Sequence, residues 1–180
     1  MIIANKLRDT NRAEYLLYMW QVEDLLRAYG CDIDTLEAQY LSRFSVPEDQ
    51  KKALRQWYAD LIEMIISEGK REKGHLQINI NTLQALTDFN AQLLASDKFP
   101  YYKGMYYKVL PYVVEVRAKG EKSGENEIET CFDILYGTML LRLQKKEISA
   151  ETAKAVQDIS TFLGQLSDYF LKDRQQPIEF

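Results

Sequence analysis

The chain has 180 residues, of which 46% are hydrophobic and 28% are charged, a composition typical of a folded globular protein rather than a disordered one. Its formal net charge of −4 gives no general attraction for phosphate polymers, which argues against nucleic acid as a partner. Two cysteines are too few for a secreted disulfide scaffold, and the chain opens without the apolar segment of a signal peptide. No uncharged stretch approaches the roughly 20 residues of a membrane span, so we expect a cytoplasmic protein.

Apolar residues at helical spacing and helix start signals recur along the chain. Thr10 is a candidate N-cap and Gly30 a candidate C′ residue of the first helix. Ser45, Pro47 and Glu48 together form the clearest start signal, because they fit a capping box with proline in the first turn. Ser149 is expected to start the last helix. The predicted helices span about 10–29, 34–43, 45–68, 81–95, 101–119, 127–146 and 149–172.

These patterns predict an all-α protein, a single-domain helical bundle of about seven helices over residues 1–172. Residues 76–81 alternate apolar and polar, but one strand has no partner, so we expect an extended lead-in. The glycine-containing segment 119–125 is a possible lobe boundary, and the tail 173–180 is expected to fray. Pro111 removes one hydrogen bond inside its helix and predicts a kinked central helix rather than a break.

The first predicted helix carries apolar residues on more than one face. Its main stripe is typical of a surface that faces the core and consists of Tyr15, Met19, Val22, Leu26 and Tyr29. Leu16, Leu17 and Trp20 lie instead among charged residues. They indicate either a partner-binding surface or a second packing face with Glu23 and Arg27 paired one turn apart. The residues of the partner-binding interpretation are Arg12, Leu16, Trp20, Glu23 and Arg27.

The run from Glu14 to Gly30, with Met1 to Ala4 before it, resembles the opening of an uncharacterised family of small bacterial proteins found mainly in gut anaerobes. The similarity extends over essentially the whole chain. It implies a helical fold and a cytoplasmic setting. It implies no activity, cofactor or site residue.

Residues 98–122 contain six basic and two acidic side chains, a local charge of +4, with aromatic residues interleaved. Aromatics among lysines can stack on bases. The regular spacing of the apolar residues favours a core helix instead, because nucleic-acid-binding domains show a wider basic surface. The kink at Pro111 can line a pocket, and the candidate residues for binding a small anionic ligand are Tyr101, Lys103, Tyr107 and Lys108.

Motifs for catalysis, metals and cofactors are absent from the sequence. His75 is the one histidine, and although Glu72 has the Glu-x-x-His spacing of di-iron bundles, a single such pair supplies too few ligands. We therefore expect a solvent-exposed histidine, no metal and no cofactor. Cys131 is expected to be buried and Cys31 partly exposed.

The leading hypothesis is a non-enzymatic helical module that binds another protein or a second copy of itself. The alternative is a helical bundle that binds a small anionic ligand. Catalysis by carboxylates and tyrosines stays open, since it needs no histidine, but the sequence indicates no reaction class. No nucleic-acid or membrane partner is expected.

Overall fold

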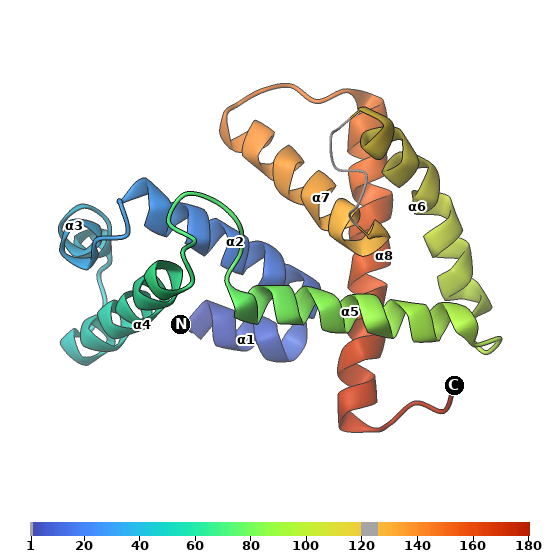
Figure 1. Cartoon of the computed structure of the whole chain (residues 1–180), viewed down its shortest axis with the longest axis horizontal. Coiled ribbons are helices and arrows are strands. Elements are labelled where there is room, and N and C mark those ends of the chain that lie inside the picture. The colour runs from blue at the N-terminus through green and yellow to red at the C-terminus, as the bar shows by residue number, and fades with distance from the viewer. Residues whose placement is uncertain (1, 120–125) are drawn as a thin grey trace.

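The computed structural model describes residues 2–119 and 126–180, and every regular element in these residues is helical (Figure 1). The elements are α1 (Ile2–Thr10), α2 (Arg12–Ala28), α3 (Ile33–Gln39), the 3₁₀ helix η1 (Leu41–Arg43), α4 (Glu48–Ser67), α5 (Gln77–Ala95), α6 (Pro100–Lys119), α7 (Glu127–Leu143) and α8 (Ala150–Gln175). The predicted all-α fold is confirmed. Within the described residues, no helix is both long enough and apolar enough to cross a bilayer. Apart from Lys119, the predicted lobe boundary at 119–125 lies outside them.

Two groups of buried side chains form the interior, because each amphipathic helix buries its apolar side on another. The first group gathers residues of α2, α5, α6 and α7 around α8. In Figure 1, α8 runs through the molecule, α5 crosses it, and α6 and α7 lie beside it. The second group lies between α1, α2, α3 and α4. α2 belongs to both groups, with Leu16 and Trp20 in the first and Met19 and Leu26 in the second.

Most helices begin where the sequence offers a side-chain cap. First-turn backbone N–H groups of α2, α3, α7 and α8 donate to the side chains of Asn11, Asp32, Asn126 and Ser149. The predicted cap at Ser149 is therefore confirmed. Gly30 follows α2 with a φ of 67°, and the N–H groups of Gly30 and Cys31 donate to carbonyls in the last turn of α2. This is the C′ position predicted for Gly30.

Two predicted helix starts are wrong. Thr10 does not cap the long N-terminal helix, because it is the last residue of α1 and its hydroxyl donates to the Lys6 carbonyl. α1 has no counterpart among the predicted helices. The capping box expected at Ser45 does not form, since α4 begins at Glu48 after Pro47 and has no side-chain cap.

The extended lead-in expected at residues 76–81 is also wrong, because α5 already begins at Gln77. Leu76, Asn79 and Leu83 are buried at helical spacing along one side. Ile78 and Ile80, which produce the alternating pattern, are both exposed. The apolar residues in this segment are thus divided between the core and the solvent.

α6 continues through Pro111 without a break, as predicted, and Figure 1 shows it bending along its length. Pro111 is exposed, so its ring lies on the solvent side of the helix. Tyr102, Val109 and Val113 are buried against the core, while Val116, expected in the same stripe, is exposed.

The C-terminal residues pack on the bundle, although the sequence predicts that they fray after 172. α8 runs to Gln175, and the backbone N–H of Ile178 donates to the Asp173 carboxylate at 2.8 Å. The ring of Phe180 lies 5.8 Å from that of Phe89 and 5.9 Å from that of Phe99. Aromatic packing therefore holds the last residues against α5 and the segment before α6.

Candidate functional site

The partner-binding surface expected on α2 is not a surface. Leu16 and Glu23 are fully buried and Trp20 is 2% exposed, because both sides of α2 face a core. Arg12 lies half-buried between the rings of Tyr15 and Phe170. The alternative interpretation, a second packing face, is the arrangement in the structure.

The carboxylate of Glu23 organises a polar cluster under the loop that leads into α5. Its Oε1 accepts hydrogen bonds from the backbone N–H of Leu76 at 2.8 Å and from Asn79 Nδ2 at 2.7 Å. Its Oε2 lies 2.6 Å from Nδ1 of His75. Three polar contacts replace the water that the carboxylate loses on burial, as a buried charge requires.

The ion pair expected between Glu23 and Arg27 does not form. Arg27 pairs instead with Asp24 at 2.8 Å, and its guanidinium donates to the carbonyls of Lys70 at 3.1 Å and of Gly74. Glu23 and Arg27 thus each hold the loop before α5 against α2. Two residues chosen from the sequence as partner contacts bind a segment of their own chain.

His75 is not the solvent-exposed side chain that we expected. Its ring stacks on the indole of Trp20 with centroids 4.2 Å apart and 14° between the planes, and its side chain is 33% exposed. A carboxylate oxygen accepts hydrogen bonds, so the tautomer that fits this contact has its proton on Nδ1 and leaves Nε2 for another partner. In catalytic triads a carboxylate orients the histidine through the same ring nitrogen.

A cavity of about 290 Å³ adjoins this cluster, and we call it the histidine pocket. Its walls include Trp20, His75 and Asn79, with Lys70 and Glu129 adding one charge of each sign. Within the described part of the chain, Nε1 of Trp20 and Oδ1 of Asn79 are buried without a hydrogen-bond partner. A buried donor or acceptor left unpaired costs about 1–3 kcal/mol. Two residues of the pocket lining therefore hold an unused donor and an unused acceptor.

The sequence model of a family described as "Domain of unknown function (DUF4924)" matches residues 1–177. The chain belongs to this family. No curated protein and no solved structure matches it. The resemblance to an uncharacterised helical family is thereby confirmed. The family description assigns no role to any residue, so the roles of residues in this DUF4924 chain are inferred from its own geometry.

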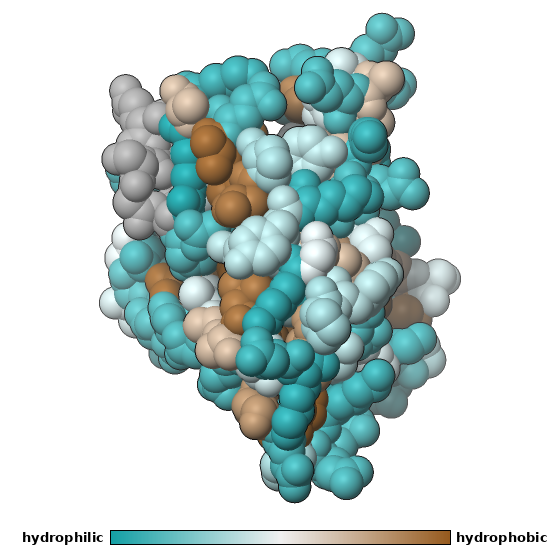
Figure 2. Space-filling view, turned by 90° about the vertical axis from the view of Figure 1, so that its right-hand side faces the viewer, coloured by the Kyte–Doolittle hydropathy of each residue, from teal (hydrophilic) through white to brown (hydrophobic). Residues whose placement is uncertain are grey.

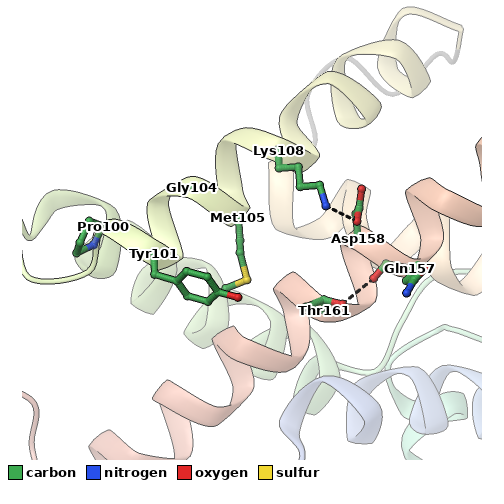
Figure 3. Close-up of a pocket in the computed structure, with 8 residues that line it drawn as sticks. All are labelled: Pro100, Tyr101, Gly104, Met105, Lys108, Gln157, Asp158 and Thr161. Carbon is green, nitrogen blue, oxygen red and sulfur yellow. Dashed lines mark hydrogen bonds and ion pairs between the residues drawn. The ribbon is translucent and has the colours of Figure 1, made fainter.

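The four residues expected to bind an anion do not converge in the DUF4924 chain. Tyr101 and Lys108 line a cavity of about 530 Å³ between α6 and α8 (Figure 3). Lys103 and Tyr107 are not among its lining residues. Lys103 pairs with Asp97 at 3.2 Å, and Tyr107 is 64% exposed. This cavity therefore brings together Tyr101 and Lys108 of the four.

Lys108 is also engaged within the same cavity. Its ammonium lies 2.7 Å from Asp158 Oδ1, and Figure 3 shows this contact across the opening. The hydrogen bond between the two raises the pKa of Lys108 and lowers the pKa of Asp158, so both stay charged at neutral pH. The carboxylate offsets the lysine charge, which makes the cavity a poor site for an anion.

Other reactive groups in the described residues lie in apolar surroundings. Cys131 is buried as predicted, and burial raises the pKa of its thiol to about 12. Cys31 is buried too, although we expected partial exposure. No group of three or more His, Cys, Asp or Glu side chains in residues 2–119 and 126–180 is placed to hold a metal ion.

Proposed function

We propose that this DUF4924 protein is a helical small-molecule-binding protein and that the histidine pocket is its site. The observation that carries the proposal is a cavity whose lining residues include two with a buried, unpartnered atom, Trp20 Nε1 and Asn79 Oδ1. Folded proteins leave few buried polar groups unpaired, and a bound molecule is one way to pair them. A convergent set of polar groups in a concave site is the usual arrangement for ligand recognition.

The chemistry of the walls limits the ligand. Trp20 Nε1 requires an acceptor and Asn79 Oδ1 requires a donor, and His75 Nε2 can make a third contact. A small molecule with an amide or ureido group supplies the acceptor and the donor side by side. The volume of about 290 Å³ admits only a compact ligand. Lys70 and Glu129 bring opposite charges to the walls, which favours a molecule without net charge.

The site is built before any ligand arrives. Glu23 fixes the imidazole and Asn79, and Arg27 fixes the loop backbone at Lys70 and Gly74. Groups that are already held in place lose little entropy on binding, so more of the contact energy remains as affinity.

A thermal-shift screen of compact amides, ureas and carboxylic acids tests this proposal. A ligand present at 100 times its dissociation constant stabilises the folded protein by about 2.7 kcal/mol. Trp20→Phe removes the indole N–H but keeps an aromatic ring against His75, so it should abolish most of the stabilisation. Trp57→Phe is the matched control, because Trp57 packs on Tyr58 in α4 and does not line the pocket. Equal stabilisation in both variants would exclude the histidine pocket.

Self-association through α6 is a second candidate function, favoured by the outer face of that helix. Six exposed, uncharged residues follow one another at spacings of four and three: Pro100, Gly104, Tyr107, Pro111, Val114 and Ala118. This is the spacing with which two helices pack along a seam. Figure 2 views the side of the molecule on which α6 lies, and brown and pale side chains interrupt the teal surface there.

The expected occupant of the α6 face is a second copy of the chain. Val114 is 58% exposed, and such an apolar side chain gains from burial against an equally uncharged face. Light scattering after size-exclusion chromatography should give a dimer for the wild type and a monomer for Val114→Lys. A wild-type monomer at high protein concentration would exclude this second function and leave the first untouched.

A further inference from the structure

A third cavity opens on the opposite side of α2 from the histidine pocket, among α1, α2, α4 and the residues that flank η1. Its volume is about 410 Å³, and we call it the tyrosine cavity. The aliphatic and aromatic walls come from Ile3, Phe44, Val46 and Leu54, with Gln50 beside them. Among the residues that the structure describes, no lysine, arginine, histidine, aspartate or glutamate lines it. An ion placed there would lose its water without gaining a counter-charge.

Three tyrosines, Tyr18, Tyr40 and Tyr58, complete the lining. The rings of Tyr40 and Tyr58 lie edge to face, with centroids 6.5 Å apart. Burial raises the pKa of Tyr58 and of Tyr18, so both keep their protons at neutral pH. Each of the three tyrosines carries one O–H donor. The lining therefore combines apolar side chains with residues that can donate a hydrogen bond.

The rim of the tyrosine cavity is apolar as well. Ile3 and Phe44 are both more than one third exposed, although their side chains are among the most hydrophobic in the protein. A molecule seated in the cavity would cover part of both. The ring of Phe44 packs edge to face on the ring of Tyr40, with centroids 5.1 Å apart and 80° between the planes.

We propose that the tyrosine cavity binds a neutral, mainly apolar small molecule that carries one hydrogen-bond acceptor, such as a carbonyl. The apolar walls contact the body of the molecule, and a tyrosine O–H donates to its acceptor. Its volume lies within the range of small-molecule sites. This ligand class differs from that of the histidine pocket, so the two proposals stand or fall separately.

The probe for the test is 6-propionyl-2-(dimethylamino)naphthalene, a neutral naphthalene with one ketone whose emission moves to shorter wavelength in apolar surroundings. Titration into the folded wild type should give a saturable blue-shifted signal with one site per chain. The anionic dye 8-anilino-1-naphthalenesulfonate, titrated in parallel, should bind at least tenfold more weakly. Absence of saturable binding of the neutral probe, or tighter binding of the anionic dye, would overturn the proposal.

Variants locate the bound probe. Val46→Trp fills the cavity and should abolish saturable binding. Phe44→Asp changes a residue at the exposed rim, so it should weaken binding while the buried core keeps its packing. Tyr58→Phe removes one hydroxyl and should raise the dissociation constant about fivefold, the value of one hydrogen bond. Leu143→Asp at the exposed end of α7 is the control and should leave the dissociation constant unchanged. Unchanged affinity in both Val46→Trp and Phe44→Asp would contradict the location.

Discussion

The imidazole of His75 lies parallel to the indole of Trp20, 4.2 Å away, while its Nδ1 lies 2.6 Å from the Glu23 carboxylate. One contact sets the plane of the ring and the other sets its rotation, so the position of Nε2 is defined. Glu23 lies 52 residues before His75 in the chain. The pair therefore joins α2 to the start of α5 and fixes a polar pocket between them.

The first prediction concerns the stability that Glu23 contributes. Glu23→Ala leaves three polar groups without their acceptor inside the protein, so the free energy of unfolding should fall by about 3 kcal/mol. Glu23→Gln retains one acceptor oxygen and should lower the free energy of unfolding by less than Glu23→Ala does. Glu14→Ala, an exposed glutamate on the same helix, should stay within about 0.5 kcal/mol of the wild type. Urea unfolding followed by circular dichroism measures all three, and equal losses at positions 14 and 23 would contradict the cluster.

Stability should decrease in alkaline solution because several tyrosines are buried. Burial is the main cause that raises the pKa of Tyr58, Tyr102 and Tyr136 in the folded protein. A raised folded pKa means that their contribution is complete below the unfolded value of about 10 and is lost as the pH rises above it. Absorbance at 295 nm should show these tyrosines ionising only together with the loss of helical signal. Full ionisation of all tyrosines in a protein that is still helical would be the opposite result.

Both thiols should be unreactive in the native state. Cys31 and Cys131 are buried, and the raised pKa of Cys131, about 12, keeps that thiol protonated. A disulfide reagent such as Ellman's should therefore label neither cysteine in buffer and both in 6 M guanidinium chloride. Rapid labelling of Cys131 in the native protein would show that the core around α7 is open.

The C-terminal residues give a direct test of a correction to the sequence-based expectation. Phe180→Ala removes ring contacts with Phe89 and Phe99 and should lower the free energy of unfolding by about 1 kcal/mol. Gln176→Ala, an exposed change nearby, should have little effect. Equal stability of the two variants would show that the C-terminal residues are as free as the sequence suggests.

The sequence predicts the helical class well, because local signals determine it. Ser149 and Gly30 act at the ends of helices as their residue types indicate. The second apolar face of α2 is equally visible in the sequence, since Leu16 and Trp20 depart from its main stripe. What the pattern leaves open is whether such a face meets solvent, a partner or another helix of the same chain.

The histidine pocket was beyond the reach of local patterns. Glu23 meets Asn79 across 56 residues, and no spacing in the sequence indicates that pairing. The exposed Ile78 and Ile80 mask the helical pattern that buries Asn79. His75 lies in a charged, glycine-containing loop, which suggests an exposed side chain. The contacts with Trp20 and Glu23 of α2 bury most of it. The one feature of the sequence that pointed to this site was the presence of a single histidine.

Nuclear magnetic resonance of the single imidazole tests the central claim most directly. In a protein labelled with ¹⁵N at histidine, His75 should give one set of signals, with ring protons shifted upfield by Trp20 and a proton held on Nδ1. Trp57→Phe should leave these signals in place, whereas Glu23→Ala should move them toward those of a free histidine. Free-histidine signals in the folded wild type would contradict the pocket described here.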